Sequence, residues 1–93
     1  MYYVYILFCN DGKPYTGCTS NLLERMGRHK KGQVPATRER LSVKLASYIA
    51  FGDKYKAFDF EKYLKSGSGR AFVKRHLLAK NYQIDTNPLG ILT

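Results

Sequence analysis

Residues 2–19 read YYVYILFCNDGKPYTGCT and contain two strand-like segments on either side of a turn. The first segment, Tyr2 to Cys9, is rich in aromatic and β-branched residues, which fit the pleated surface of a strand. The second segment, Lys13 to Thr19, follows Asn10-Asp11-Gly12, a tripeptide typical of tight turns. The stretch therefore predicts a β-hairpin.

The register of this hairpin decides whether Tyr5 and Tyr15 share a face, because side chains alternate with a period of two. A two-residue loop, Asp11-Gly12, would place Tyr15 opposite Phe8 and the two tyrosines on opposite faces. A three-residue loop, Asp11-Gly12-Lys13, would place Tyr15 opposite Cys9 and both tyrosines on one face. Both registers remain open on the sequence alone.

A helix is predicted directly after the hairpin. Asn21 can cap its start, with Glu24 three residues later in position to reach back, and Gly32 provides a stop after about Lys31. The apolar stripe of this helix is expected to consist of Leu22, Leu23 and Met26.

Residues 33–42, with Pro35 and a charged run, predict a loop, and Val43 to Phe51 predicts a third strand, although Lys44 and Ser47 break its alternation. Gly52-Asp53 starts a second helix, whose inward stripe is expected to be Ala57, Phe60 and Leu64.

The segment Ser66-Gly67-Ser68-Gly69 is expected to form a loop before a last helix from about Arg70 to Lys80, with Phe72, Val73 and Leu77 turned inward. The resulting order is β-β-α-β-α-α. We therefore predict an α/β fold of the α+β type, with a small, three-stranded, mostly antiparallel sheet flanked by helices.

The composition favours one compact domain with a polyanionic partner. The 93 residues include 16 Lys and Arg against 7 Asp and Glu, a formal net charge of +9. Nucleic acid is the leading candidate partner for such a surface. A solvated basic surface without a partner is the alternative, and an acidic membrane is less favoured because no long basic amphipathic helix stands out.

Two cysteines, Cys9 and Cys18, are too few for a disulfide framework and lack the spacing of a zinc site. A reducing, cytoplasmic setting is therefore expected. The apolar start, Met1 to Leu7, has neither a basic residue before it nor a cleavage pattern, and it is too short to span a bilayer. It is expected to be a buried strand.

Three residues with polar or charged side chains follow one another at intervals of ten, and a glutamate lies further along the chain. Tyr5 ends the triplet Tyr3-Val4-Tyr5, Tyr15 opens the triplet Tyr15-Thr16-Gly17 ten positions later, Arg25 follows after ten more, and Glu61 lies on the second predicted helix. With these triplets the chain resembles the GIY-YIG endonuclease superfamily from about Tyr2 to about His76. Its short form resembles the small stand-alone bacterial members related to the nuclease domain of the excision-repair incision subunit.

The resemblance implies a GIY-YIG-like nuclease domain over residues 1–80, and Pro88 and Gly90 predict an irregular tail over residues 81–93. It implies a divalent-metal-dependent endonuclease that hydrolyses phosphodiester bonds in DNA, structured or single-stranded, with low sequence specificity. The metal would be Mg²⁺ or Mn²⁺. A non-catalytic nucleic-acid-binding module of the same fold is the alternative, and a protein-interaction domain is a third reading.

The resemblance also implies roles for individual residues. Glu61 would hold the metal, and the planar Arg25 guanidinium would bind phosphate oxygens. Tyr5 would be the general base or would position water, with Tyr15 beside it, and the division between them is open. A phenol of ordinary pKa near 10 needs nearby positive charge to act as a base. His29, one turn after Arg25, would bind phosphate or assist proton transfer, unless it is structural or solvent-exposed.

Structural explanations compete with these roles, since Glu61 also stands four residues before Lys65, a favourable helical ion pair. Backbone amides of the Ser-Gly segment could hold a phosphate. The residues predicted to contact nucleic acid are Gly17, a first basic group of Lys62, Lys65, Arg70, Lys74 and Arg75, and a second group of Arg28, Lys30 and Lys31. His76 is expected to be structural.

The sequence departs from the family pattern at several positions. Tyr3 stands where the first triplet has glycine, Thr16 occupies the middle of the second triplet, and Cys18 replaces a lysine that some members carry. Asn81 is the candidate for the family's asparagine near its end.

Overall fold

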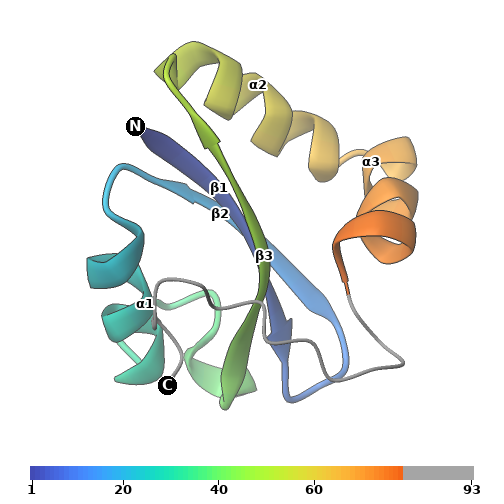
Figure 1. Ribbon diagram of the computed structural model, residues 1–93. Helices are drawn as coiled ribbons and strands as arrows, with labels where there is room; N and C mark the ends of the chain where they lie inside the picture. The colour runs from blue at the N-terminus through green and yellow to red at the C-terminus, as the bar shows by residue number, and fades with distance from the viewer. Residues whose placement is uncertain (79–93) are drawn as a thin grey trace.

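The computed structural model describes residues 1–78 and contains one antiparallel sheet with helices on both faces (Figure 1). The elements are β1 (Tyr2–Cys9), β2 (Pro14–Thr19), α1 (Leu22–Lys30), β3 (Val43–Phe51), α2 (Lys54–Leu64) and α3 (Gly67–Phe72), with a short 3-10 turn at Arg38–Arg40 and a π-helical turn at Val73–Leu77. The strand order is β2-β1-β3. The predicted fold class and element order are confirmed.

The hairpin adopts a register that differs from both predicted ones. Leu7 lies opposite Tyr15 and Tyr5 opposite Gly17, so the loop consists of residues 10–12. Gly12 has a φ of +78°, which suits the left-handed position of a three-residue loop. Tyr15 lies opposite Leu7, and Leu7 points to the same face of β1 as Tyr5. Tyr5 and Tyr15 therefore share a face, as in the predicted three-residue loop.

The irregular alternation within β3 has a structural cause. Ile6 pairs with Ser47 and Leu7 with Leu45, so Ala46 is an extra residue, and the strand carries a bulge there. Ser47 is drawn towards the last helical turn, where its hydroxyl donates a hydrogen bond to the Leu77 carbonyl.

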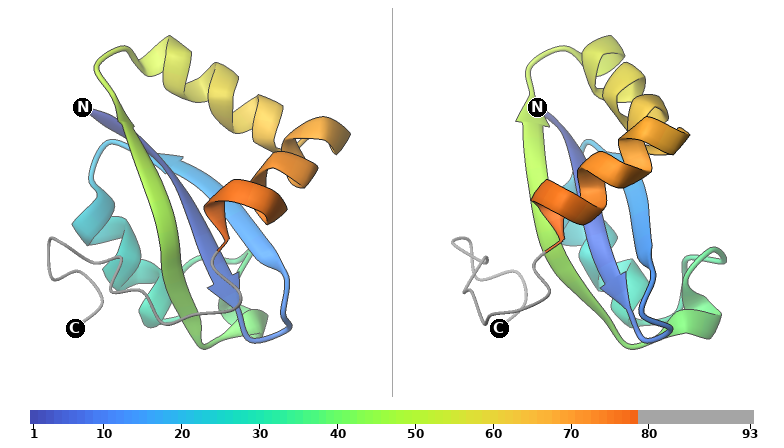
Figure 2. Two further views of the ribbon diagram at one scale, coloured as in Figure 1. Left: turned by 45° about the vertical axis from the view of Figure 1, so that its right-hand side comes forward. Right: turned by 90° about the vertical axis from the view of Figure 1, so that its right-hand side faces the viewer.

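The central strand β1 divides the core into two clusters, one on each face of the sheet. On one face, Tyr5, Leu7 and Cys9 pack with residues of α1 and β3. On the other face, Val4 and Ile6 pack with residues of α2, α3 and the π-helical turn. In the views of Figure 1 and Figure 2, α1 lies on the side opposite α2 and α3.

Helix α1 has the predicted ends but a different buried face. The Asn21 side chain accepts a hydrogen bond from the Glu24 amide at 3.0 Å, and Gly32 follows the helix with a φ of +72°. Leu23 was predicted to face the core, but it is 66% exposed. Leu22, Met26 and His29 form the buried stripe instead, at a spacing of four and then three residues.

Helix α3 begins earlier than predicted, because the Ser-Gly segment is its first turn. Ser66 caps the helix by accepting from the Gly69 amide at 3.2 Å, and its hydroxyl donates to the Tyr63 carbonyl at 2.6 Å. A Cβ atom at Gly69 would overlap the Tyr63 carbonyl oxygen and lie 2.6 Å from Leu64 Cα. Glycine is therefore needed for α3 to lie directly against the end of α2.

The end of the last predicted helix at Lys80, the irregular tail 81–93 and Asn81 lie outside the described residues. Within residues 1–78, none of the helices is long and apolar enough to cross a membrane. Cys9 and Cys18 are free thiols.

Candidate active site

The predicted site residues Tyr5, Tyr15 and His29 form one aromatic cluster on the α1 face of the sheet. The ring centroids of Tyr5 and Tyr15 lie 6.3 Å apart, and the His29 ring lies 5.6 Å from Tyr5 and 5.5 Å from Tyr15. The Tyr5 hydroxyl is hydrogen-bonded to His29 Nε2 at 2.9 Å. Three residues that are far apart in sequence therefore meet through the shared face of β1 and β2.

His29 is fully buried, so it is not the solvent-exposed residue that the sequence left open. Its second ring nitrogen, Nδ1, is hydrogen-bonded to Thr37 Oγ1 at 2.7 Å. Burial, with the nearby charges of Arg25 and Arg28, lowers the pKa of His29 to about 4, so its imidazole is neutral at physiological pH. Sequence reasoning missed Thr37, because nothing in the loop pattern marks one threonine as a partner of a histidine eight residues earlier.

Gly17 makes room for the Tyr5 ring. A Cβ atom at this position would overlap Cζ and the hydroxyl of Tyr5, and would lie 2.9 Å from Cε1. The second triplet therefore needs glycine because the phenol of the first triplet lies against the backbone of β2. The nucleic-acid contact that the sequence assigned to Gly17 stays a prediction, whereas the structure gives this buried residue a packing role.

Arg25 acts on the Tyr5 hydroxyl from α1. Burial raises the pKa of Tyr5 to about 12, whereas the hydrogen-bonding and charge of the Arg25 guanidinium oppose that shift. Arg25 Nε is itself buried and has no hydrogen-bond partner among residues 1–78. The guanidinium thus has unused donor capacity at the site.

Glu61 reaches the same region from the opposite side of the sheet, because β2 is an edge strand with α1 on one side and α2 on the other. Its carboxylate adds to the effect of burial in raising the pKa of both Tyr5 and Cys18. Glu61 Oε2 accepts an ion-paired hydrogen bond from Lys65 Nζ at 3.1 Å, so the helical pair considered from the sequence is present. Within residues 1–78, this is the one side-chain hydrogen bond that Glu61 makes.

The residues present fit a divalent cation held in an open site. No group of three or more His, Cys, Asp and Glu side chains that could enclose a metal occurs within residues 1–78. The Glu61 carboxylate offers oxygen donors and is only partly exposed, with 24% of its side chain accessible. Mg²⁺ is commonly held by one or two carboxylates together with water and phosphate oxygens. His29 is not available as a ligand, because both of its ring nitrogens are already hydrogen-bonded.

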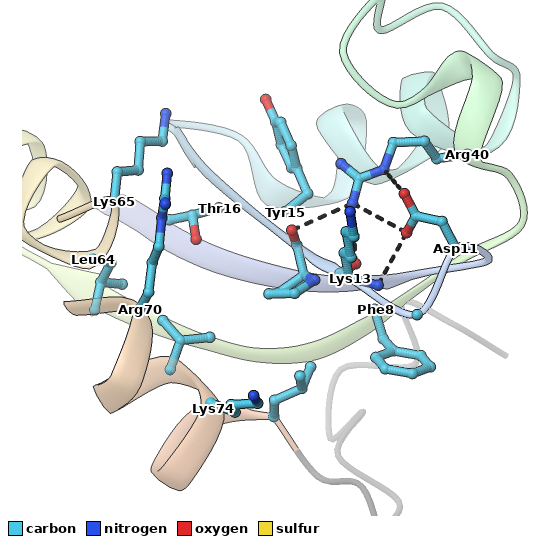
Figure 3. A pocket seen from close by; sticks show the side chains of 14 residues that line it. Phe8, Asp11, Lys13, Tyr15, Thr16, Arg40, Leu64, Lys65, Arg70 and Lys74 are labelled. Carbon is cyan, nitrogen blue, oxygen red and sulfur yellow. Dashed lines mark hydrogen bonds and ion pairs between the residues drawn. The ribbon is translucent and has the colours of Figure 1, made fainter. Parts of the chain in front are cut away.

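A groove runs along the α2 and α3 side of β2 towards the hairpin tip (Figure 3). Its lining includes three residues of the first predicted basic group, Lys65, Arg70 and Lys74, and two cations that the sequence did not single out, Lys13 and Arg40. The lining also includes four apolar side chains: Phe8, Leu64, Val73 and Leu78. Figure 3 places Lys65 and Arg70 towards one end of the groove and Lys13 and Arg40 towards the other.

The other predicted basic residues lie outside this groove lining. Lys62 and Arg75 are exposed, and Arg28, Lys30 and Lys31 are exposed at the end of α1. The phosphate cradle of the Ser-Gly segment stays a prediction, and two amides near it are already used: the Gly69 amide donates to Ser66 Oγ and the Arg70 amide to the Ser66 carbonyl. His76 is exposed, with its ring 4.9 Å from that of Phe72.

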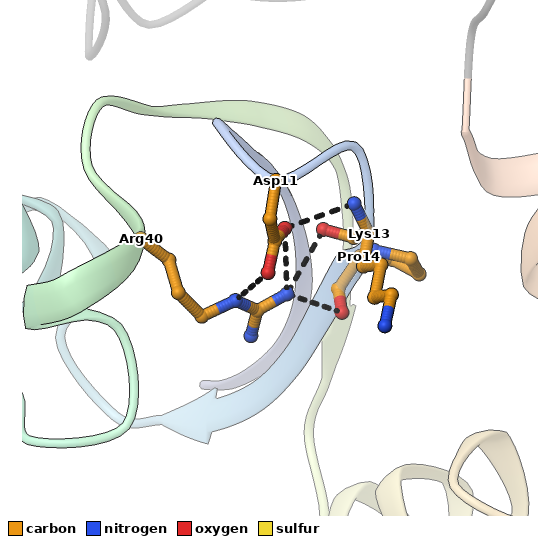
Figure 4. Close-up of polar contacts among 4 residues, drawn as sticks. All are labelled: Asp11, Lys13, Pro14 and Arg40. Carbon is orange, nitrogen blue, oxygen red and sulfur yellow. Dashed lines mark hydrogen bonds and ion pairs between the residues drawn. The ribbon is translucent and has the colours of Figure 1, made fainter.

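Arg40 joins the loop before β3 to the hairpin (Figure 4). Its Nε donates to Asp11 Oδ2 at 2.7 Å, and its Nη2 donates to the Lys13 carbonyl at 3.1 Å. The hydrogen bond to Arg40 is the main reason that the pKa of the Asp11 carboxyl lies below its usual value. The loop that carries Thr37 is therefore fastened to the hairpin that carries Tyr15.

Comparison with protein families matches residues 1–76 to the GIY-YIG catalytic domain. Since this match covers most of the chain, the protein belongs to the GIY-YIG family, and this membership supports a nuclease-type function.

Individual relatives carry the designation UPF0213, which states no activity. A UPF0213 protein of Streptococcus agalactiae serotype V is 37% identical over 78 residues, covering 80% of this chain and 89% of the relative. A UPF0213 protein of Clostridium perfringens is 44% identical over 66 residues, covering 70% and 71%. The solution NMR structure of a UPF0213 protein from Bacillus halodurans is similar with a TM-score of 0.53 and 34% identity, covering 83% of this chain and 87% of that one.

Proposed function

We propose that this protein is a cytoplasmic, divalent-metal-dependent endonuclease that hydrolyses phosphodiester bonds in DNA, structured or single-stranded, with low sequence specificity. One observation carries the proposal: the rings of Tyr5, Tyr15 and His29 form one cluster, with centroids 5.5–6.3 Å apart. The charges of Arg25 and Glu61 both act on the Tyr5 phenol of this cluster. Family membership and the net charge of +9 support the same reading.

Glu61 would hold the cation, either Mg²⁺ or Mn²⁺. The bound ion would act as a Lewis acid on the phosphate and stabilise the leaving oxygen. The ion pair with Lys65 uses one carboxylate oxygen of Glu61, Oε2, and leaves Oε1 without a side-chain partner among residues 1–78. This pairing and a metal-binding role are compatible, because a carboxylate has more than one acceptor site.

Arg25 would bind the phosphate oxygens on which charge increases during hydrolysis. Its buried Nε lacks a partner among residues 1–78, and a buried unpaired donor costs about 1–3 kcal/mol unless something fills it. A phosphate oxygen would fill it, and the planar guanidinium suits such binding.

The two tyrosines would divide their roles by accessibility. Tyr15 is half-buried, so its hydroxyl is the one that can meet the attacking water. Tyr5 is fully buried, hydrogen-bonded to His29, and protonated at neutral pH because its pKa is about 12. We therefore assign water activation to Tyr15, and the orientation of the surrounding hydrogen bonds to Tyr5 and His29.

The test of the catalytic proposal is a cleavage time course on supercoiled plasmid and on labelled branched and single-stranded DNA, with Mg²⁺ or Mn²⁺. Glu61→Gln should reduce the cleavage rate by about a hundredfold or more, since it removes the charged ligand. Asp59→Asn changes an exposed acid on the same helix and should leave the rate within about twofold. Equal activity in Glu61→Gln and wild type would rule out this metal site.

The second candidate is a non-catalytic nucleic-acid-binding module. The observation that favours it is the groove lined by cations. It predicts binding in every condition and cleavage in none. Under either candidate, the double variant Arg70→Gln/Lys74→Gln should reduce the slope of log K against log salt concentration by about one to two. Lys44→Gln, an exposed lysine on β3 outside the groove lining, should leave the slope unchanged. An unchanged slope in the double variant would exclude the groove as the binding surface.

A further inference from the structure

Thr37 lies in the loop between α1 and β3 and is fully buried, although loops rarely bury a threonine without a partner. Its hydroxyl is 2.7 Å from His29 Nδ1, and His29 Nε2 is 2.9 Å from the Tyr5 hydroxyl. The three side chains therefore form a buried chain of two hydrogen bonds that ends at the candidate active site.

A neutral imidazole carries one ring proton, and the hydrogen bonds made by its two nitrogens decide which nitrogen holds it. If Nδ1 is protonated, it donates to Thr37, and the Tyr5 hydroxyl donates to Nε2. If Nε2 is protonated, it donates to the Tyr5 oxygen, and Thr37 donates to Nδ1. In the first arrangement the hydroxyl proton of Thr37 has no acceptor. In the second arrangement the hydroxyl proton of Tyr5 has no acceptor.

The Arg25 guanidinium decides between the two arrangements. The positive charge of Arg25 lies near the Tyr5 hydroxyl, and arginine can only donate hydrogen bonds. The Tyr5 oxygen must therefore turn its lone pairs to Arg25, which favours pointing its proton at His29. A phenol is also a stronger hydrogen-bond donor than an aliphatic hydroxyl, because it is far more acidic. Leaving the Thr37 proton unpaired therefore costs less than leaving the Tyr5 proton unpaired.

We propose that Thr37 is a positioning residue that holds His29 in the Nδ1–H tautomer, so that Tyr5 donates to His29 and presents its lone pairs to Arg25 and the reaction site. Backbone hydrogen bonds of the loop fix the position of the Thr37 hydroxyl. The Thr37 amide donates to the Val34 carbonyl at 3.1 Å and the Arg40 amide donates to the Thr37 carbonyl at 2.8 Å. The Arg40 side chain in turn binds Asp11 of the hairpin.

The tautomer can be read directly from the imidazole nitrogen shifts and couplings of His29 in ¹⁵N-labelled protein, near neutral pH and without metal. Wild type should show the Nδ1–H form. Thr37→Val, which has nearly the same shape but no acceptor, should populate the Nε2–H form, and Thr37→Ser, which keeps the hydroxyl, should restore the wild-type pattern. An Nε2–H form in wild type, or an unchanged Nδ1–H form in Thr37→Val, would overturn the assignment.

Cleavage kinetics supply a second readout, and only this readout rests on the proposed endonuclease function. Thr37→Val should lower kcat about tenfold with little change in KM, as expected for a residue that orients an active-site side chain, and Thr37→Ser should retain most of the activity. If Thr37→Val fails to fold, Thr37→Ala takes its place, because it also removes the hydroxyl and should populate the Nε2–H form. Expected tautomers together with no cleavage in any variant would refute the endonuclease but not the positioning of His29.

Discussion

The two faces of the sheet differ in what they bury, although β1 contributes side chains to both. On the α1 face, the core includes Tyr5 and His29, and His29 is bonded in turn to the buried Thr37. On the α2 and α3 face, the fully buried side chains of the cluster are apolar, among them Val4, Ile6 and Leu64. One face thus contains polar groups that must be paired, and the other is held together by apolar packing.

This difference indicates how one small domain combines stability with chemistry. Buried polar groups cost free energy unless each finds a partner, so they are retained where their orientation is useful. The apolar face can then supply the stability that the polar face does not. Each face also depends on one glycine where two parts of the chain approach closely, Gly17 below Tyr5 and Gly69 against α2.

The largest expected effect comes from the glycine of the apolar face. Gly69→Ala should lower the free energy of unfolding by about 3 kcal/mol or more, because the new methyl group would overlap the Tyr63 carbonyl and force α3 away from α2. Urea denaturation followed by circular dichroism measures this change. Gly67→Ala is the matched control, since a Cβ atom there has no neighbour within 4 Å. Equal stability of the two variants would show that α3 is not tightly packed.

The sequence predicted the apolar face and the element order well, because these depend on periodicity. The stripe of Ala57, Phe60 and Leu64 and the cap at Asn21 are local signals, and both are confirmed. The start of α3 was predicted wrongly, because its serines and glycines read as a loop. Only the tertiary contact between Gly69 and the backbone of α2 explains why a glycine-rich turn is helical.

The polar face was harder to predict, because its partners come from distant segments. The spacing of Tyr5, Tyr15 and Arg25 identified residues that the structure does bring together, yet nothing local indicated that Thr37 would bond to His29. Leu23 was expected inside the core, and the buried stripe of α1 runs through His29 instead. A search for hydrophobic periodicity treats histidine as a polar residue. His29 can be buried because both of its ring nitrogens are hydrogen-bonded, to Tyr5 and to Thr37.

Acid should weaken the polar face selectively. The folded-state pKa of His29 is about 4, below its ordinary value near 6.5, so the unfolded chain binds the proton more tightly. Stability is therefore fully present above about pH 6.5 and falls as the pH drops towards 4. From pH 7.5 to pH 4.5 the loss should be about 2.5 kcal/mol, measured by urea denaturation at each pH. The contribution of Asp11, whose pKa is lowered, is lost mainly at more acidic pH.

Two variants separate His29 from other acid-sensitive groups. His29→Gln should flatten the pH dependence between 7.5 and 4.5, even though it lowers stability at neutral pH. His76→Gln replaces an exposed histidine and should leave the wild-type slope intact. A slope that persists in His29→Gln would mean that the buried imidazole is not what makes the protein acid-sensitive.

A smaller effect on stability is expected at the glycine of the polar face. Gly17→Ala should cost about 2 kcal/mol, because the neighbour it displaces is the ring of Tyr5, and a side chain can move more readily than a backbone. Its effect on cleavage should be larger than this loss suggests, since the Tyr5 hydroxyl would leave His29 and Arg25. The comparison of Gly17→Ala with Gly69→Ala, under conditions where both remain folded, should thus show activity lost mainly in Gly17→Ala.

Gly27→Ala provides the internal standard for both substitutions and the smallest expected change. Gly27 lies within α1, and a Cβ atom there would have nothing within 4 Å. Alanine should therefore stabilise the helix by up to about 1 kcal/mol and leave cleavage unaffected. Because Gly27 lies between Arg25 and His29 in sequence, loss of activity in this variant would mean that any change in this part of α1 disturbs the site. A loss confined to Gly17→Ala would instead locate the sensitivity at the contact between β2 and the Tyr5 phenol.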